Sequence, residues 1–429
     1  MPEKMTQMDS ARQGKLTPEL LECAAAESID PQDLAAQVAS GLVAIPANKR
    51  RNTKRRAYAV GQGCRPKVNA NVGTSKDLCD IDTELRKLKA AEDAGAEAVM
   101  DLSTGGDLRE IRKLLIDSTA MMFGSVPIYE AAVNATAAGR TVLEMNPDDM
   151  LGAVRTHAED GVDFVTVHAG VTQHSVRALD SDKRICGVVS RGGTMLTEWI
   201  RRNGRENPLY ERFDEVIEIC REHDVTISLG DGFRPGALAD AFDAGQIAEL
   251  TILGELVRRC RDAGVQTIVE GPGHVPLDQI ETQVMTAKEL TSGAPLYLLG
   301  PLVTDVAPGF DHITSAIGAA NAVRAGADFI CYVTPAEHLR LPLEKDVRDG
   351  VIAARIAAHA GHITRDPGAR RWDDAVSRLR RDRNWEESIA KSMSPEDARR
   401  IRSEGPPMDD SVCSMCGDLC VFKLADENN

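Results

Sequence analysis

Three cysteines near the end of the chain have a spacing that suits a metal centre. Cys413, Cys416 and Cys420 form a C-x2-C-x3-C pattern, so their thiolates can converge on one centre from a single turn. A structural zinc ion needs a fourth ligand, and the nearest histidine in the sequence is His362. Three cysteines on a 4Fe-4S cluster instead leave one iron open to a small molecule, as cleavage of S-adenosylmethionine requires. The pattern favours such a cluster over a partial zinc knuckle, and the other seven cysteines, scattered singly, are expected to be reduced thiols.

Two histidines and two acids follow short apolar runs. His274 ends the segment EGPGH and His338 ends TPAEH, and imidazole is a common ligand of zinc and iron. A hydrogen-bonding role for each histidine remains an equal alternative at this point. Glu270 and Asp231 offer carboxylates for acid and base chemistry or for substrate amines, and His168 is a third polar candidate of this kind.

Glycine-rich segments follow most of the apolar runs. Examples are NVGTS, DLSTGGD, SRGG, GDGFRPG and EGPGH. Glycine lets backbone N–H groups approach an anion, and Arg191 and Arg234 lie beside two of these segments, where a guanidinium can grip phosphate. The sequence lacks a Walker A pattern and a GxGxxG after its first strand, so neither ordinary nucleotide hydrolysis nor a Rossmann cofactor is indicated.

The elements that must position these residues alternate between apolar runs and amphipathic segments. This alternation is typical of βα units around a parallel sheet. An α/β fold built on a (β/α)8 TIM-type barrel is therefore expected, with a doubly wound open sheet as the runner-up. The carboxyl ends of barrel strands share one rim, where active sites are built. Nine runs compete for the eight strand positions, so at least one is misassigned: KVNANV, AEAVMDL, VPIYEA, DFVTVHA, ICGVVS, VTISLG, QTIVEG, PLYLLG and DFICYVT.

Segments outside the barrel pattern divide the chain further. Thr17 before Pro18 is a helix N-cap signal in an N-terminal helical appendage. Charged helical patterns follow the barrel, and the prolines and acids of EGPPMDDSV mark a linker before the cysteines. The expected division is a helical appendage at 1–58, the barrel at 59–345, C-terminal helices at 346–403, and a linker with the cluster-binding segment at 404–429.

Charge and hydrophobicity limit the partners. The chain has 51 Lys+Arg against 66 Asp+Glu, a formal charge of −15, which argues against binding to a nucleic-acid backbone. Residues 49–56, KRRNTKRR, are best interpreted as a solvated loop in this acidic context. The charged N-terminus does not resemble a secretory signal and no apolar run is long enough to span a bilayer, so we expect a cytoplasmic protein without membrane contact.

Long motifs in a fixed order connect the chain to a known family. They include KVNANVGTS, VMDLSTGGD, NGRENPLYERFD, EGPGHVP, GPLVTDVAPGFDHITSAIG, CYVTPAEHLRLP and CSMCGDLC. From about Met5 to Lys423 the chain closely resembles the phosphomethylpyrimidine synthase family of thiamine biosynthesis, in its short form. The resemblance implies a radical S-adenosylmethionine barrel, usually a homodimer, that rearranges 5-aminoimidazole ribotide into 4-amino-5-hydroxymethyl-2-methylpyrimidine phosphate. It also implies a reducing electron-transfer protein as partner, and a cluster segment that reaches the partner subunit's active site.

The same resemblance assigns roles to individual residues. It implies a divalent ion, usually zinc, on His274 and His338, and the 4Fe-4S cluster on the three C-terminal cysteines. Glu270, Asp231 and His168 are the candidates for orienting the imidazole and ribose. The substrate contacts that it implies are Asn71, Met100, Tyr129, His168, Ser190, Arg191, Gly192, Asp231, Gly232, Phe233, Arg234, Glu270 and Tyr297.

Four residues depart from the usual motifs and leave the product open. Cys64, Pro66, Phe233 and Phe310 replace the more common Leu, Thr, Leu and Tyr. The alternative is 5-hydroxybenzimidazole synthase of anaerobic cobalamin biosynthesis, a sister branch that starts from the same ribotide. A zinc hydrolase on the same barrel is a third hypothesis, but it leaves the cysteine triplet without a role. A non-catalytic metal-binding module, in turn, does not explain the charged loops of the rim.

Overall fold

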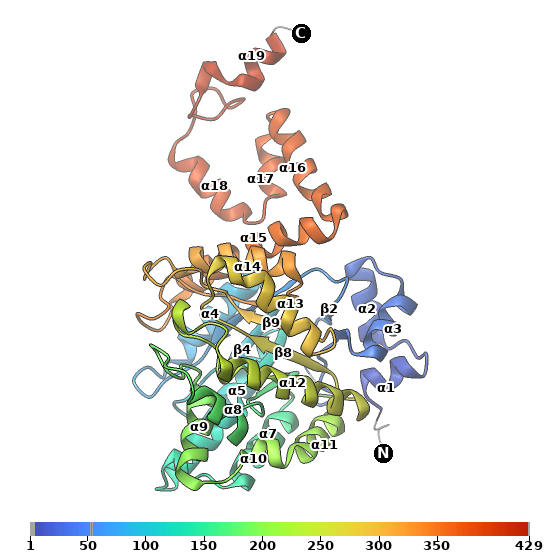
Figure 1. Cartoon of the computed structure of the whole chain (residues 1–429). Coiled ribbons are helices and arrows are strands. Elements are labelled where there is room, and N and C mark those ends of the chain that lie inside the picture. The colour runs from blue at the N-terminus through green and yellow to red at the C-terminus, as the bar shows by residue number, and fades with distance from the viewer. Residues whose placement is uncertain (1–4, 52, 54, 428–429) are drawn as a thin grey trace. The chain divides into compact units, whose positions relative to one another are not determined.

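A closed barrel of parallel strands forms the centre of the larger of two compact units, as a computed structural model that describes residues 5–51, 53 and 55–427 shows (Figure 1). Each strand pairs with the next one along the chain, and the last strand pairs with the first. The expected (β/α)8 barrel is confirmed, and closure excludes the open sheet. The barrel strands are β3 (Lys67–Val72), β4 (Ala98–Asp101), β5 (Met122–Ser125), β6 (Phe164–Val167), β7 (Thr226–Leu229), β8 (Thr267–Gly271), β9 (Leu296–Leu299) and β10 (Phe329–Cys331).

Helices connect these strands and surround the barrel (Figure 1). Helix α5 shows why they form: Asp107 caps its N-terminus by accepting the Glu110 N–H, and Leu108, Ile111 and Leu115 recur on one buried face. The helices are α4 (Ile81–Asp93), α5 (Leu108–Asp117), α6 (Pro127–Ala137), α7 (Pro147–Glu159), α8 (Gln173–Leu179), α9 (Arg191–Asn203), α10 (Pro208–Glu211), α11 (Phe213–His223), α12 (Ala244–Asp262), α13 (Ile280–Leu290), α14 (Asp311–Ala325) and α15 (Glu344–Arg365). Short 3-10 turns lie at η1 (Val142–Glu144), η2 (Leu238–Asp240) and η3 (Leu277–Gln279).

The third predicted strand, VPIYEA at residues 126–131, is wrong. Pro127 begins helix α6 there, because its fixed φ and missing N–H suit the first helical position. The true strand is β5, whose sequence MFGS was not recognised since it is short and contains glycine. A Cβ on Gly124 would lie 2.2 Å from the ring of Phe164, so only glycine leaves room for that ring inside the barrel.

The fifth predicted strand, ICGVVS at residues 185–190, is also wrong. Its first two N–H groups, those of Ile185 and Cys186, donate to the Asp240 carboxylate at 2.6 and 2.9 Å. This segment therefore follows α8 as an irregular loop, because its backbone donors are satisfied by a side chain. The other seven predicted strands all contain a barrel strand.

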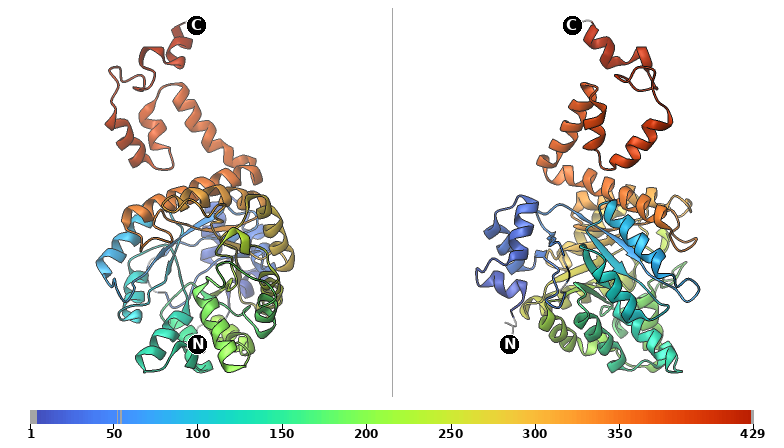
Figure 2. Two further views of the ribbon diagram at one scale, coloured as in Figure 1. Left: turned by 60° about the vertical axis from the view of Figure 1, so that its left-hand side comes forward. Right: turned by 180° about the vertical axis from the view of Figure 1, so that it is seen from behind.

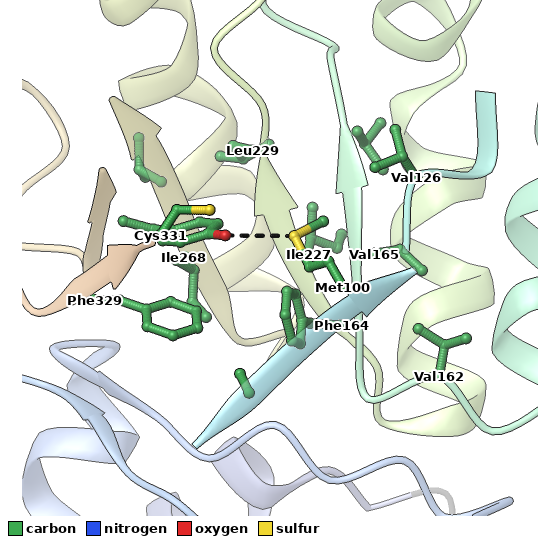
Figure 3. Packing of buried hydrophobic residues seen from close by; sticks show 14 of the residues in the cluster. Met100, Val126, Val162, Phe164, Val165, Ile227, Leu229, Ile268, Phe329 and Cys331 are labelled. Carbon is green, nitrogen blue, oxygen red and sulfur yellow. Dashed lines mark hydrogen bonds between the residues drawn. The ribbon is translucent and has the colours of Figure 1, made fainter. Parts of the chain in front are cut away.

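Aromatic side chains fill the barrel interior. Phe164 and Phe329 meet edge to face with ring centroids 6.2 Å apart, and Tyr297 stacks on Phe329 at 4.3 Å. The Tyr297 hydroxyl donates to the sulfur of Met100 at 3.5 Å, the contact drawn as a dashed line in Figure 3. This packed layer lies directly below the carboxyl ends of the strands. It fills the barrel interior there and excludes solvent from it.

The N-terminal segment forms a small helical layer beside the barrel (Figure 2, blue). Its elements are α1 (Gln7–Arg12), α2 (Pro18–Glu27), α3 (Pro31–Ser40) and the antiparallel pair β1 (Val43–Ala44) and β2 (Val60–Gly61). The predicted Thr17 cap is confirmed, with its side chain accepting the Leu20 N–H. Leu20, Leu34 and Val38 bury themselves in a core of their own.

The basic segment at residues 49–56 is solvated only in part: among its described residues Lys49, Arg50 and Arg56 are exposed as predicted, whereas Arg51 is buried. The Arg51 side chain is fully buried and pairs with the buried carboxylate of Asp163, just before β6. Its guanidinium also donates to the carbonyls of Met121 and Thr119 at 2.8 and 2.7 Å. Arg55 lies 3.8 Å from the same carboxylate. Two arginines of this segment therefore neutralise a buried acid at the amino ends of the barrel strands.

Residues 362–429 form a second compact unit, separate from residues 1–361. Its elements are η4 (Pro367–Ala369), α16 (Arg370–Arg381), α17 (Trp385–Ala390), α18 (Pro395–Glu404), η5 (Gly417–Leu419) and α19 (Val421–Glu427). Residues 405–412 contain no helix or strand, and the Arg402 guanidinium stacks over the Trp385 ring at 4.7 Å. The predicted boundaries after residues 58, 345 and 403 stay predictions. Within the described residues, no helix is both long enough and apolar enough to cross a bilayer.

Candidate active site

A cavity lies at the carboxyl ends of the barrel strands, the rim on which the sequence placed the candidate residues. Every barrel strand, or the loop that directly follows it, contributes to its wall. Its lining residues are Asn71, Met100, Leu102, Val126, Tyr129, Thr166, His168, Asp231, Arg234, Glu270, Gly271, Tyr297, Leu299 and Cys331. The wall therefore combines an apolar floor with a few convergent polar groups, as in most small-molecule sites.

The structure brings most of the predicted substrate contacts together. Eight of the thirteen line the cavity: Asn71, Met100, Tyr129, His168, Asp231, Arg234, Glu270 and Tyr297. Ser190, Arg191 and Gly192 lie beside it at the start of α9, while Gly232 and Phe233 belong to the loop that carries Asp231 and Arg234.

The first turn of α9 packs against two residues of the cavity wall. Ser190 caps the helix, and its hydroxyl lies 3.3 Å from Nε2 of His168. A Cβ on Gly192 would come within 2.4 Å of the His168 ring, so glycine permits this close approach. The Arg191 guanidinium lies 4.8 Å from the centre of the Tyr129 ring, a cation–π contact that holds its charge beside the cavity.

A buried carboxyl group holds the loop after β7. Glu249 on α12 accepts the N–H groups of Gly232 and Phe233 with one oxygen each, both at 2.8 Å. Arg184 donates to the Phe233 carbonyl at 2.6 Å and forms an ion pair with Asp243. Neither Glu249 nor Arg184 was singled out from the sequence, because a charged residue within a helical pattern gives no local signal for such a contact.

Burial sets the charges inside the cavity. It raises the pKa of Asp231 well above its ordinary range, although Arg234 lies 3.3 Å away and opposes this. Burial, aided by the Arg234 charge, lowers the pKa of His168 to about 3, and burial raises the pKa of Tyr129. Burial also works against the charge on Arg234, but Asp231 and Tyr129 outweigh it and raise the Arg234 pKa. At neutral pH, Arg234 is therefore cationic beside an uncharged imidazole, and burial favours the protonated form of the Asp231 carboxyl group.

Two polar atoms in this wall lack a partner. Nδ1 of His168 and Oδ2 of Asp231 are buried without a hydrogen bond to any of the described residues. Buried polar atoms are nearly always hydrogen-bonded, so these two indicate where a polar ligand would complete the site.

Several lining residues were missed by sequence reasoning. Cys331 accepts hydrogen bonds from the amides of Asn71 and Asn69 at 3.2 and 3.6 Å, and burial raises the pKa of its thiol. Thr166 on β6 lies two residues before His168, which directly follows the strand, so side-chain alternation points both into the cavity and could have identified Thr166. The remaining missed residues are Leu102, Val126, Gly271 and Leu299.

The two predicted metal-ligand histidines come together. His274 follows β8 and His338 follows β10, and their ring centroids are 5.3 Å apart. Asp305 lies 2.7 Å from Nδ1 of His274, and Asp311 lies 3.7 Å from Nδ1 of His338. In the described part of the chain, no three His, Cys, Asp or Glu side chains form a group that could hold a metal ion.

The cysteine triplet lies in the unit at residues 362–429. Hydrogen bonds from the Gly417 N–H to the Cys413 carbonyl and from the Leu419 N–H to the Cys416 carbonyl, at 3.2 and 3.0 Å, shape it into a turn that leads into η5. All three thiols are free of disulfides, and Cys416 is exposed. The spacing thus places the three thiols on one short turn, although their sulfurs are not gathered into a metal-binding group here.

The chain is similar to known proteins over nearly its whole length. Residues 6–427 match the family described as "Radical SAM ThiC family". The chain is 52% identical to the phosphomethylpyrimidine synthase of Moorella thermoacetica and 53% identical to that of Desulforudis audaxviator, each alignment covering 99% of this chain and 98% of the relative. It is 52% identical to phosphomethylpyrimidine synthase 1 of Methanosarcina mazei, with the same coverage. The chain belongs to the radical SAM ThiC family.

Proposed function

We propose that the chain converts 5-aminoimidazole ribotide into 4-amino-5-hydroxymethyl-2-methylpyrimidine phosphate, the reaction of thiamine biosynthesis for which its relatives are named. The observation that carries this proposal is the cavity, which gathers eight of the predicted ribotide contacts on one barrel rim. Full-length similarity to phosphomethylpyrimidine synthases supports it. A thiamine-requiring strain that lacks its own synthase should grow when it carries this gene. Failure to grow, with accumulation of a benzimidazole, would contradict the proposal.

The charges of the cavity suit a ribotide. Arg191 and Arg234 are the cationic groups beside it, and a guanidinium binds phosphate through two parallel N–H donors. His168 is uncharged at neutral pH, and burial favours the uncharged form of Asp231, so both residues suit hydrogen bonds with the sugar or base. Their unpartnered atoms, Nδ1 and Oδ2, would receive these bonds. The chain therefore binds the phosphate, orients the sugar and base, and surrounds them with apolar side chains.

Membership of the radical SAM family implies a 4Fe-4S cluster and S-adenosylmethionine. Cys413, Cys416 and Cys420 are the residues that would hold the cluster, since three free thiols on one turn fit three of its irons. When bound, these cofactors supply the radical chemistry of the rearrangement. The apolar side chains of the cavity wall would help to exclude water from the reacting atoms.

We also propose that His274 and His338 share one zinc or other divalent ion. Asp305 bonds Nδ1 of His274, which fixes the tautomer and leaves Nε2 for a metal, as outer carboxylates do in many metal sites. Two imidazoles with 5.3 Å between ring centres fit one ion whose other positions are filled by substrate or water. Metal analysis of the His274→Ala/His338→Ala variant with its cluster intact should show one ion fewer per chain. Unchanged stoichiometry would contradict the shared site.

We further propose that the chain forms a homodimer and works in the cytoplasm. An electron-transfer protein would supply the electrons that reduce its cluster. Exposed apolar side chains stand on the loops that follow the barrel strands: Leu78, Ile185, Val306, Phe310 and Leu339. The cysteine segment also exposes apolar side chains: Met408, Met415, Leu419 and Val421. These surfaces support a dimer in which the cluster segment of one copy covers the rim of the other.

Co-expression tests this dimer. A Cys416→Ala chain and a Glu270→Gln chain, each inactive alone, carry different tags and are purified together as a mixed dimer. The mixed dimer should recover activity, because one of its two shared sites is intact. An inactive mixed dimer would show that each chain serves its own site.

The benzimidazole alternative receives less support. None of the four residues that depart from the usual motifs, Cys64, Pro66, Phe233 and Phe310, is among the residues that line the cavity. Cys64 belongs to the N-terminal core and Phe310 is exposed. A zinc hydrolase is weaker still, because the described residues form no group of three ligands around His274 and His338, and the cysteine turn has no role in it.

A further inference from the structure

Two hydroxyl groups in the barrel wall bond the same oxygen of Glu270. Thr166 donates from Oγ1 to Oε1 at 2.8 Å, and Ser228 donates from Oγ to Oε1 at 3.1 Å. Thr166 on β6 pairs with Ser228 on β7, and Glu270 lies on the adjacent strand β8. Both hydroxyl residues are buried, so three neighbouring strands hold this contact in a fixed geometry.

The second oxygen of this carboxylate has a different hydrogen-bonding environment. No group of the described residues donates a hydrogen bond to Oε2 of Glu270, and the side chain lines the cavity. The last torsion of a glutamate side chain is broad and has no strong preference of its own. The two hydroxyl donors therefore fix the plane of the carboxylate, so that its other oxygen is left for a ligand in the cavity.

We propose that Thr166 and Ser228 are positioning residues that hold the Glu270 carboxylate so that Oε2 accepts an N–H or O–H donor of the substrate. The inference rests on the proposed function, since the amino and hydroxyl groups of 5-aminoimidazole ribotide are such donors. Without the two hydroxyls the carboxylate rotates, and ligand binding must order it. Neither residue touches the reacting atoms in this role; both act through Glu270.

Calorimetric titration of the anaerobic holoprotein with 5-aminoimidazole ribotide tests the role. Thr166→Val keeps the shape of the side chain and removes the donor, and Ser228→Ala removes the second donor. Each should weaken binding about tenfold, the size expected for one hydrogen bond to a charged group. Thr166→Ser keeps a hydroxyl and should recover most of the affinity.

Thr226 provides a matched control. It is a buried threonine on β7, the strand of Ser228, and its hydroxyl has no partner among the described residues. Thr226→Val makes the same change of shape within the same barrel and should leave ribotide affinity within about twofold, because no hydrogen bond is lost.

A double-variant cycle separates positioning from packing. If Thr166 acts through Glu270, Thr166→Val should cost nothing further in a Glu270→Ala background. Equal losses in both backgrounds, or unchanged affinity of the Thr166→Val and Ser228→Ala proteins, would overturn the inference while the wild-type protein still binds ribotide. A wild-type protein that does not bind ribotide would overturn the proposed function and this inference with it.

Discussion

Glu249 gives the folded chain a pH dependence that one substitution should remove. Burial raises the pKa of this carboxyl group from its ordinary 4.5 to about 8, so the folded state keeps a proton that the unfolded state releases. The unfolded state binds fewer protons between these two values, and the free energy of unfolding therefore falls as pH rises through that window. At about 1.4 kcal/mol per pH unit, levelling off near pH 8, the loss between pH 6 and 8 is roughly 2 kcal/mol. Glu249→Gln has the shape of the protonated acid and cannot titrate, so it should lose this part of the slope.

Tryptophan fluorescence measures the effect in the barrel alone. Trp199 is buried in α9, whereas Trp372 and Trp385 lie in the unit at residues 362–429. Urea unfolding is followed at pH 6, 7 and 8 in a Trp372→Phe/Trp385→Phe background, with and without Glu249→Gln. Glu255→Gln, an exposed change on the same helix, should keep the wild-type slope. The free energy of unfolding is compared at the three pH values. If it falls equally with pH in the Glu249→Gln and wild-type proteins, the buried carboxyl group does not keep its proton in the folded state.

Three other changes test separate parts of the molecule. Arg234→Lys removes the forked donor and should weaken ribotide binding by about 1–3 kcal/mol in calorimetry; an equal loss for the dephosphorylated nucleoside would contradict the phosphate role. Cys416→Ala should abolish cluster iron and turnover while unfolding reported by Trp199 is unchanged, since Cys416 lies outside the barrel unit; retained iron would refute its role as a ligand. Burial lowers the pKa of His157 to about 4, so the unfolded state binds more protons between pH 4 and 6.5 and stability falls on acidification. His157→Gln should reduce the decrease in thermal midpoint between pH 7 and 5, and an unchanged decrease would show that His157 does not cause it.

The barrel could be predicted from the sequence because seven of its strands are apolar runs bounded by turn residues. The two errors have local physical causes. In VPIYEA the Pro127 signal for a helix start competes with β-branched residues, and in ICGVVS the decisive partner, Asp240, is distant in sequence. The missed strand contains Gly124, which is required by the Phe164 ring on the neighbouring strand β6 and by nothing in its own segment.

The cavity wall was predictable mainly through motif resemblance. Glycine loops and polar residues after strands located the rim, but the contacts that orient the wall come from elsewhere. Glu249 lies within a helix and accepts its hydrogen bonds from a distant loop. Ser228 lies in a strand whose sequence pattern indicates only an apolar segment. Such contacts depend on which strands become neighbours, and this is determined only when the barrel closes.

Product analysis tests the central proposal most directly. The reduced holoprotein is incubated anaerobically with 5-aminoimidazole ribotide and S-adenosylmethionine, and the small molecules are identified by mass spectrometry. The account predicts that the ribotide is consumed and that 4-amino-5-hydroxymethyl-2-methylpyrimidine phosphate appears, with none in the Cys416→Ala protein. Formation of 5-hydroxybenzimidazole in its place, or no consumption of the ribotide by protein with a full complement of cluster iron, would contradict it.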